Sequence, residues 1–267
     1  MVTRDTAWPP GTPCWADLSA DDVGRARAFY SGLFGWSIMP GPPEAGGYSM
    51  CELAGRAVAG LGPKTDPPDA PVAWTTYLAT DDAGETAARI TAAGGQLLIE
   101  PFDVMDSGVM AIAADPAGAV FGIWQSGLFH GAQLASEPGA MIWNESLSRD
   151  LDGSKAFYQA VFGYGFGDIA GDGFRYATLE LNGAIVGGIG ELRADQRDVP
   201  AHWSAYFAVA DTDAAISAVV RLGGRVIAPA WDSPYGRMAI VRDDQGGVFS
   251  VMAAVAASGA PGTATAS

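Results

Sequence analysis

The sequence predicts an α+β protein built from two tandem copies of one domain, and two observations lead to this prediction. The first is a repeat that spans almost all of the 267 residues. The second is a shared order of strand-like and helical segments inside each copy. A repeat of this length indicates the architecture directly, because equivalent residues are expected at equivalent places in a duplicated fold. At a constant displacement of 128, Trp15, Phe29, Tyr30, Phe34 and Gly35 match Trp143, Phe157, Tyr158, Phe162 and Gly163.

Each copy is expected to contain two modules with the order β-α-β-β-β. In the first module, residues 14–18 form a strand and Asp22 caps a helix over residues 23–33. Gly35 ends this helix, because glycine adopts the left-handed conformation at little cost. Apolar and small residues alternate along residues 48–53 and along residues 57–61, and a short turn separates the two segments. This pattern predicts a hairpin.

A fainter internal repeat of about 60 residues relates the second module to the first, and the second module follows the same plan. A strand over residues 75–79 leads to a helix capped by Asp82 and stopped by Gly94 and Gly95. Further strands follow and close at residues 121–125. The whole chain is therefore predicted to hold four such modules, two in each copy.

The domain limits follow from the repeat and from composition. We expect an N-terminal arm over residues 1–8, a first domain over 9–127 and a linker over 128–138. A second domain over 139–254 and a disordered tail over 255–267 complete the chain. The tail is composed almost entirely of Ala, Gly, Ser, Thr and Pro, which bury too little apolar area to offset the entropy of ordering.

Composition excludes several classes of protein. Hydrophobic residues make up 49% and charged residues 17%, as in globular proteins. The formal net charge of −15 repels phosphate, so we expect neither nucleic acid nor a membrane surface as a partner. We find no secretory signal and no long apolar run, and we expect a cytoplasmic protein. Cys14 and Cys51 are expected to be buried, reduced thiols.

The repeated motif Ala-Phe-Tyr-x3-Phe-Gly at residues 28–35 and 156–163 resembles the vicinal oxygen chelate superfamily. Helices stopped by Gly-Gly and a turn at residues 115–118 before the last strand strengthen the resemblance, which covers nearly all of residues 9–254. This superfamily includes glyoxalases, extradiol dioxygenases and bleomycin resistance proteins, and the chain looks like an actinobacterial four-module subgroup labelled hydroxylase-like. The resemblance implies tandem glyoxalase-like domains, whose four βαβββ modules form two cupped sheets with the helices outside.

In metal-using members, each module supplies one His, Glu or Gln from its first strand and one Glu from its last. An indole N–H only donates hydrogen bonds and glycine has no side chain, so this sequence lacks such a donor set. The resemblance therefore implies the fold without its metal, and we expect no metal and no other cofactor. His130 and His202 are the two histidines, and neither has a second histidine at ligand spacing. The equivalent positions are Trp15, Gly60, Thr75, Gly122, Trp143, Gly188, Ser204 and Ser250.

Strand periodicity predicts which side chains share the concave faces. Residues two apart on a strand lie on one face, so Asp17 is expected beside Trp15, and Glu145 beside Trp143. A carboxyl group next to an indole in an apolar pocket has a raised pKa, which suits general acid–base chemistry. The candidate catalytic residues are Asp17, Glu145, Tyr77 and Tyr206. The candidate ligand-binding residues are Trp15, Thr75, Trp124, Trp143, His202, Ser204 and Met252.

Two functions fit this interpretation. The first is binding of a hydrophobic or aromatic small molecule, such as an antibiotic or a biosynthetic intermediate, for sequestration or as an accessory to a tailoring oxygenase. The second is a metal-free isomerase, cyclase or hydroxylation-assisting enzyme acting on such a molecule. A metal-dependent lyase or dioxygenase would need ligands that the sequence lacks.

A structural alternative is that the tryptophans and tyrosines only fill the space that a metal would occupy. Four modules in one chain can complete two cavities, so a monomer and a homodimer are both compatible with the sequence. The sequence identifies neither the ligand nor the half of the chain that binds it.

Overall fold

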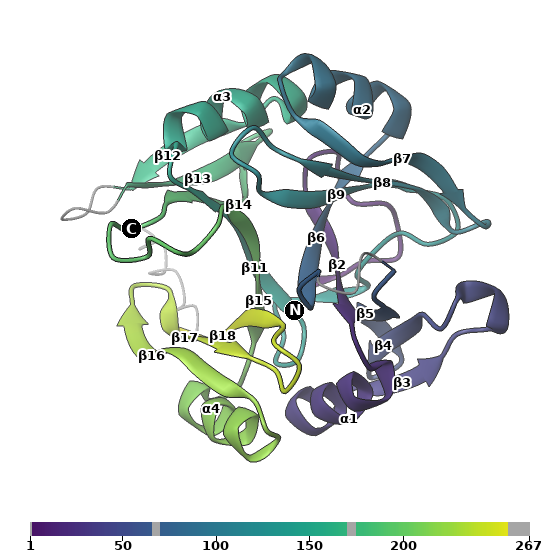
Figure 1. The fold of residues 1–267 in the computed structure, drawn as a ribbon, viewed down its shortest axis with the longest axis vertical. Coiled ribbons are helices and arrows are strands. Elements are labelled where there is room, and N and C mark those ends of the chain that lie inside the picture. Colours follow the sequence, from purple (N-terminus) through teal and green to yellow (C-terminus); the bar gives the residue numbers. More distant parts are fainter. Residues whose placement is uncertain (1, 66–69, 170–174, 256–267) are drawn as a thin grey trace, which may run out of the picture.

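The computed structural model describes residues 2–65, 70–169 and 175–255, and it contains two mixed β-sheets with helices outside them (Figure 1). Within these residues the first sheet has eight strands. In the order in which they pair, they are β3 (Ser37–Pro40), β4 (Ser49–Leu53), β5 (Arg56–Pro63), β2 (Pro13–Ala20), β6 (Ala73–Thr80), β9 (Val120–Ser126), β8 (Gly108–Ala114) and β7 (Gln96–Val104).

The second sheet repeats this order. Its main strands are β12 (Gly165–Ile169), β13 (Tyr176–Leu181), β14 (Ala184–Glu191), β11 (Met141–Ser148), β15 (His202–Ala208), β18 (Val248–Ala254), β17 (Gly236–Arg242) and β16 (Arg225–Ser233). Two short strands, β1 (Val2–Thr3) and β10 (Leu134–Ala135), pair with each other and attach to β11. The predicted α+β fold and the β-α-β-β-β order of all four modules are confirmed.

The helices begin and end where their capping residues predict. They are α1 (Val23–Phe34), α2 (Ala83–Ala92), α3 (Leu151–Phe162) and α4 (Thr212–Arg221), with a 3-10 turn over Pro43–Ala45. The Asp22 side chain accepts a hydrogen bond from the backbone N–H of Arg25, which the helix leaves without an internal partner. Gly35 ends α1 at a φ of 72°, where a side chain would be strained.

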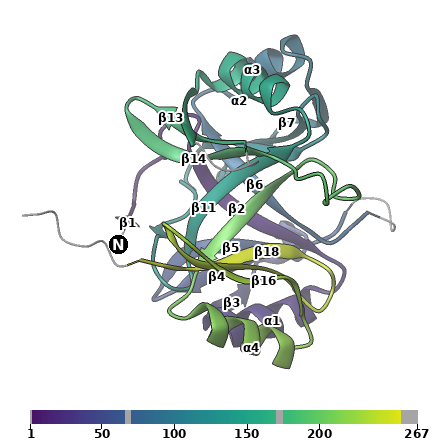
Figure 2. The same cartoon turned by 90° about the vertical axis from the view of Figure 1, so that its left-hand side faces the viewer.

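Two hydrophobic cores join the halves of the chain. One lies by α1 and α4, and the other by α2 and α3, so that helices from different halves cover each core (Figures 1 and 2). Tyr30 of α1 donates a hydrogen bond to Asp243 over 2.9 Å, and Tyr158 of α3 donates one to Asp115 over 3.1 Å. These buried contacts cross from one half to the other and hold the two sheets together.

The face of each central strand that points to the other sheet is apolar, with few polar groups. Trp74 on β6 and Phe207 on β15 lie 4.9 Å apart between ring centroids. Beside them, Thr76 Oγ1 donates to Asn144 Oδ1 over 2.9 Å. Because side chains alternate along a strand, Trp15, Tyr77 and their counterparts point the opposite way, onto two concave faces on opposite sides of the molecule.

The predicted arm and the predicted linker pair with each other, which the sequence did not predict. β1 lies in the predicted arm and β10 in the predicted linker, and the two pair in antiparallel fashion. The predicted disordered tail lies outside the described residues apart from Val255. Among the described residues, no helix is both long and apolar enough to cross a membrane.

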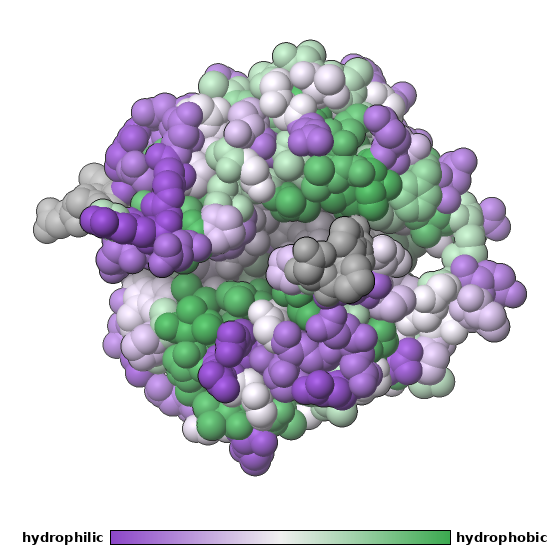
Figure 3. All heavy atoms as spheres, viewed as in Figure 1, coloured by the Kyte–Doolittle hydropathy of each residue, from purple (hydrophilic) through white to green (hydrophobic). Residues whose placement is uncertain are grey.

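Exposed apolar side chains gather near the outer strand of each sheet (Figure 3). On β7 they are Leu98, Ile99 and Phe102, and on β16 they include Ile227 and Trp231. The two sets occupy equivalent places in the repeat, at the rims of the two concave faces.

Candidate functional site

The concave face of the first sheet carries a chain of hydrogen bonds from an indole to a carboxylate. Trp15 Nε1 donates to the hydroxyl of Tyr48 over 2.9 Å, and that hydroxyl donates to Asp17 Oδ2 over 3.2 Å. Tyr77 lies opposite Trp15 on β6 and also hydrogen-bonds to Asp17. Trp15 and Asp17 therefore share a face, as their spacing on β2 predicts.

The second sheet repeats this arrangement with tighter contacts. Trp143 Nε1 donates to the hydroxyl of Tyr176 over 2.9 Å, and that hydroxyl donates to Glu145 Oε2 over 2.8 Å. The Tyr206 hydroxyl donates to Glu145 Oε1 over 2.6 Å, so each carboxylate oxygen accepts from one tyrosine. Four residues from three strands thus form one hydrogen-bonded group.

Tyr48 and Tyr176 belong to these groups, and strand periodicity did not identify them. Both tyrosines lie over a glycine of the neighbouring strand. A Cβ atom built at Gly60 would lie 1.8 Å from the Tyr48 hydroxyl, and one built at Gly188 would lie 1.8 Å from the Tyr176 hydroxyl. The signal was present in the repeat, which keeps each tyrosine and its glycine at the same displacement.

The two carboxyl groups have raised pKa values. Burial raises the pKa of Asp17 from 3.8 to about 7, although hydrogen bonds from Tyr77 and Tyr48 oppose the shift. Burial also raises the pKa of Glu145, opposed mainly by Tyr206 and Tyr176. The direction expected from the sequence is confirmed for both groups. The pKa values of the tyrosine hydroxyls lie above their usual range because of the same burial, so these hydroxyls stay protonated and donate.

The first face is more closed than the sequence predicted. Trp15, Tyr77 and Trp124 are 4%, 5% and 7% exposed and belong to a core cluster, so they do not line an open hollow. The reason is Phe129 of the linker, whose ring packs edge-on against Trp15 at 4.8 Å and lies 5.9 Å from Trp124. The Trp124 indole N–H donates to the backbone carbonyl of Phe129 over 3.0 Å and holds the linker in place.

The remaining candidate residues lie on the predicted faces with different degrees of burial. Thr75, Ser204 and His202 are half-buried, and Met252 is 8% exposed. His202 Nδ1 lies 2.9 Å from the backbone carbonyl oxygen of Pro200, and the electrostatic interaction of His202 with Glu145 lowers the pKa of that carboxyl group. This position agrees with the prediction that His202 lies on the same side of its strand as Ser204, toward the second concave face.

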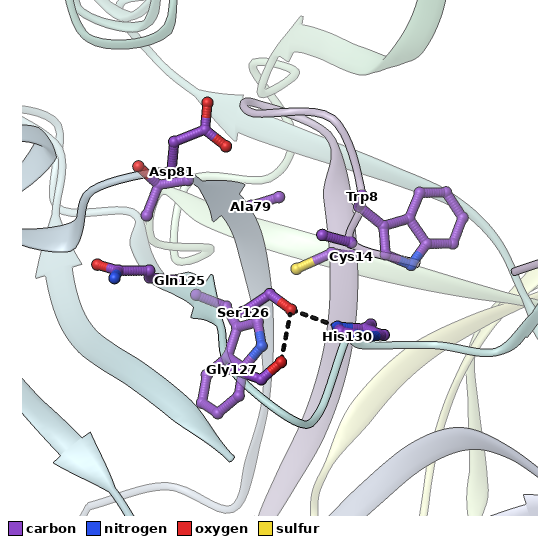
Figure 4. A pocket seen from close by; sticks show the side chains of 11 residues that line it. Trp8, Cys14, Ala79, Asp81, Gln125, Ser126, Gly127 and His130 are labelled. Atoms are coloured by element: carbon purple, nitrogen blue, oxygen red, sulfur yellow. Dashed lines mark hydrogen bonds between the residues drawn. The ribbon is translucent and has the colours of Figure 1, made fainter. Parts of the chain in front are cut away.

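A pocket of about 270 Å³ lies at one end of the first sheet, beside the N-terminal arm (Figure 4). Trp8 and Cys14 form one wall, and Ser126 lies opposite, with its hydroxyl 2.5 Å from His130 Nδ1. Of the candidate residues, Trp124 alone lines this pocket, so the pocket is separate from the indole–carboxylate groups. Cys14 and Cys51 are free, buried thiols, as predicted.

The sequence matches the family model of the Glyoxalase/Bleomycin resistance protein/Dioxygenase superfamily over residues 14–123 and 135–251. The chain belongs to this superfamily. The predicted resemblance is thereby confirmed for both halves of the chain.

Two relatives within the superfamily are similar over almost their full length. The protein CFP32 of Mycobacterium tuberculosis, named as a glyoxylase, is 42% identical over 260 residues, which cover 94% of this chain and 98% of CFP32. The anthracycline biosynthesis protein DnrV of Streptomyces peucetius is 36% identical over 261 residues, which cover 92% of this chain and 94% of DnrV.

Solved structures of the superfamily show the same fold at low sequence identity. The Mn(II)-bound glyoxalase of Novosphingobium aromaticivorans superposes with a TM-score of 0.65 at 16% identity, over 91% of this chain and 82% of that chain. The 2,2',3-trihydroxybiphenyl 1,2-dioxygenase of Sphingomonas wittichii superposes with a TM-score of 0.62 at 14% identity, over 91% of this chain and 90% of that chain.

These two enzymes raise the question of whether this member of the superfamily can hold a metal ion on its concave faces. Trp15 pairs with Tyr77, and Asp17 pairs with Thr75. Asp17 also lies beside Gly60, and Tyr77 beside Gly122, so the equivalent positions Trp15, Thr75, Gly60 and Gly122 share one face. A Cβ atom built at Gly122 would lie 2.1 Å from the Tyr77 ring, and Tyr48 similarly occupies the space above Gly60. In the described part of the chain, no three His, Cys, Asp or Glu residues are grouped as metal ligands. The donor set does not fit a divalent ion.

Proposed function

We propose that this chain binds a planar aromatic small molecule on a concave face, without a metal ion. The observation that carries the proposal is the indole–tyrosine–carboxylate group, which occurs on both sheets where metal-using members carry ligands. An apolar, aromatic wall with a few convergent polar groups is the usual form of a small-molecule site. Simple filling of space would not require a carboxylate, because burying one is costly.

The relatives suggest the class of ligand. DnrV is named for anthracycline biosynthesis, and anthracyclines are planar polycyclic aromatics that carry hydroxyl and carbonyl groups. We propose a ligand of this general class, either an antibiotic or an intermediate of its synthesis. Bound in this way, the molecule is sequestered or is presented to a tailoring oxygenase.

The test combines metal analysis with fluorescence titration. Protein purified without chelator is analysed for Zn, Fe, Ni and Mn, and its tryptophan fluorescence is titrated with a panel of hydroxylated and unsubstituted polycyclic quinones. We expect less than a tenth of an equivalent of metal, saturable quenching, and no change in affinity when EDTA or a divalent ion is added. A full equivalent of metal, with binding lost on its removal, would contradict the proposal.

A second function is favoured by the raised pKa values of the two carboxyl groups. With a pKa of about 7, Asp17 is partly ionised near neutral pH and is able to accept and return a proton. The adjacent tyrosine hydroxyls are suited to donating a hydrogen bond to a carbonyl oxygen. Such a group fits a metal-free isomerase or cyclase.

Incubation of the protein with each ligand that binds, followed by chromatography and mass spectrometry, separates the two functions. An isomerised or cyclised product whose formation is abolished by Glu145→Gln or Asp17→Asn would establish catalysis. Tight binding with the ligand recovered unchanged would leave the binding function.

A further inference from the structure

We infer that the pocket beside the N-terminal arm is a second small-molecule site, and that it takes a compact ring bearing an ammonium group next to a hydroxyl group. The pocket has a volume of about 270 Å³ and is bordered by Trp8, Cys14, Ser126 and His130 (Figure 4). It is separate from the indole–carboxylate groups, so the inference goes beyond the proposed binding function and does not depend on it.

The polar side chains of the pocket have no polar counterparts in the second half of the chain. Tyr77 pairs with Gly122 as Tyr206 pairs with Ser250, which sets the displacement between the halves at 129 on β6 and 128 on β9. Four polar lining residues correspond to apolar ones in this alignment, and the pairs are Thr80 and Val209, Asp81 and Ala210, Gln125 and Ala253, and Ser126 and Ala254. The second half forms the same sheet with these apolar residues, so the fold does not require polar groups at the four places.

Several of these polar groups have hydrogen-bonding capacity that the protein does not use. Gln125 Oε1 accepts from the backbone N–H of Ala83 over 2.9 Å, so the NH₂ end of that amide is left to donate. The Ser126 hydroxyl lies 2.5 Å from His130 Nδ1, and in either tautomer of the ring Nε2 can still form one hydrogen bond. Asp81 has no ion pair and no side-chain hydrogen bond within the described part of the chain. A polar ligand can therefore pair with groups that otherwise contact only water.

The charge of the lining favours a cation over an anion. Asp81 is exposed and carries a full negative charge, whereas no Lys or Arg belongs to the described lining. The whole chain has a formal net charge of −15, which raises the concentration of cations near its surface. Two indoles, those of Trp8 and Trp124, also line the pocket, and the face of an indole attracts a cation. An ammonium group fits this environment better than a carboxylate or a phosphate.

The walls of the pocket are held in place by the protein itself. The Trp8 indole N–H donates to the backbone carbonyl of Ala132 over 3.0 Å, and the Arg4 guanidinium lies 4.9 Å from the centre of the Trp8 ring. On another wall, the Trp124 indole N–H donates to the backbone carbonyl of Phe129 over 3.0 Å. Walls that are ordered before binding lower the entropy cost of taking up a ligand.

The size and the polar groups of the pocket together define the ligand. A volume of about 270 Å³ lies just below the range of about 300–1,000 Å³ that is usual for pockets of drug-sized ligands, so one ring fits better than a polycycle. The ammonium group pairs with Asp81, and a neighbouring hydroxyl oxygen accepts from the Gln125 amide. The apolar face of the ring contacts an indole. An amino alcohol on a six-membered ring, as in an aminocyclohexanol or an amino sugar, has this combination of groups.

The experiment compares ammonium probes with neutral partners of the same shape. The ammonium probes are trans-2-aminocyclohexanol and glucosamine, and their neutral partners are trans-cyclohexane-1,2-diol and glucose. Affinity is measured by calorimetry on wild-type protein, Asp81→Asn and Gln125→Glu. Asp103→Asn, at an exposed carboxyl group on β7 outside the pocket, is the matched control for loss of charge. Circular dichroism of each variant verifies folding.

We expect each ammonium probe to bind about fivefold more tightly than its neutral partner, as for one exposed ion pair. Asp81→Asn should remove this preference, and Asp103→Asn should leave it unchanged. Gln125→Glu keeps the oxygen that accepts from Ala83 and adds a carboxylate, so it should increase the preference. No saturable binding of either ammonium probe to wild-type protein, equal binding of ammonium and neutral probes, or a preference that survives Asp81→Asn would each overturn the inference.

Indole resonances in proton–nitrogen correlation spectra locate the bound probe, with each signal assigned from a Trp→Phe variant. Trp8 and Trp124 border the pocket, so their N–H signals should shift during titration with aminocyclohexanol. The N–H signal of Trp143, which belongs to the second concave face, should stay in place. A shift of Trp143 without shifts of Trp8 and Trp124 would place the probe on that face and contradict a second site.

Discussion

The buried carboxyl group of Asp17 should make the stability of this protein fall as pH rises, and replacing it should remove that dependence. The group has a pKa of 3.8 when free in solution and about 7 in the folded protein. Below pH 3.8 both states carry the proton, and the group costs nothing. Between the two pKa values the folded protein keeps a proton that the unfolded chain has lost, so stability decreases with rising pH until it levels off above pH 7.

The size of the effect follows from the shift. Each pKa unit corresponds to about 1.36 kcal/mol, so a shift of about three units destabilises the folded protein by about 4 kcal/mol at high pH. Between pH 5 and pH 8 the change is about 3 kcal/mol. These values are upper limits, because Asp17 keeps some contact with solvent, which screens the buried charge.

The assay is urea denaturation of wild-type protein and Asp17→Asn at pH 5 and pH 8. The amide retains an oxygen that accepts from Tyr48 but carries no charge. We therefore expect the variant to gain stability relative to wild-type protein as pH rises. Asp103→Asn, at an exposed carboxyl group on β7, controls for the loss of one negative charge from an acidic protein. A difference between wild-type protein and Asp17→Asn that is the same at both pH values would refute the raised pKa.

Three further predictions concern the scaffold. Gly60→Ala should destabilise the protein by about 1–3 kcal/mol in urea denaturation, because the Cβ of the new alanine displaces the Tyr48 hydroxyl. The control is Gly84→Ala, where the nearest atom to the new Cβ lies at 3.4 Å and little effect is expected. An equal loss of stability in both variants would contradict this explanation. Tyr30→Phe should cost about 1–3 kcal/mol by the same assay, because it removes the donor to Asp243 across the two halves, and an unchanged midpoint would contradict that assignment. Both cysteine thiols should resist Ellman's reagent at pH 8 until the protein is unfolded, because burial raises their pKa values; rapid reaction of the native protein would show that a thiol is accessible.

Much of the fold was predictable from local patterns in the sequence. Asp22 and Gly35 mark the ends of α1 through their own backbone chemistry, which needs no knowledge of the rest of the molecule. Strand alternation likewise placed Asp17 beside Trp15, since neighbours on one strand share a face regardless of the sheet around them. The repeat then transferred each of these local results to the second half.

The parts that were not predicted depend on contacts between segments whose approach no local pattern reports. Tyr48 lies just before β4 and reaches Asp17 on β2, and it does so only because Gly60 leaves space beneath its hydroxyl. Phe129 closes the first face because the linker turns back over β2 and β9, and periodicity within strands contains no information about the path of a linker. The asymmetry between the two faces therefore became visible only in three dimensions.

The tyrosines and the glycines beneath them are best understood as one structural feature. A carboxylate side chain at Gly60 or Gly188 would occupy the volume of the Tyr48 or Tyr176 hydroxyl, so a metal ligand and a tyrosine exclude each other at these places. In metal-using members, ligands from both modules of a pair meet at one ion and so connect the modules. Here Asp17 of one module hydrogen-bonds to Tyr77 of the next, and Glu145 does the same with Tyr206. The hydrogen-bonded groups thus make the connection between modules that an ion makes elsewhere, which explains how the cupped sheets keep their shape around a donor set that does not fit a metal.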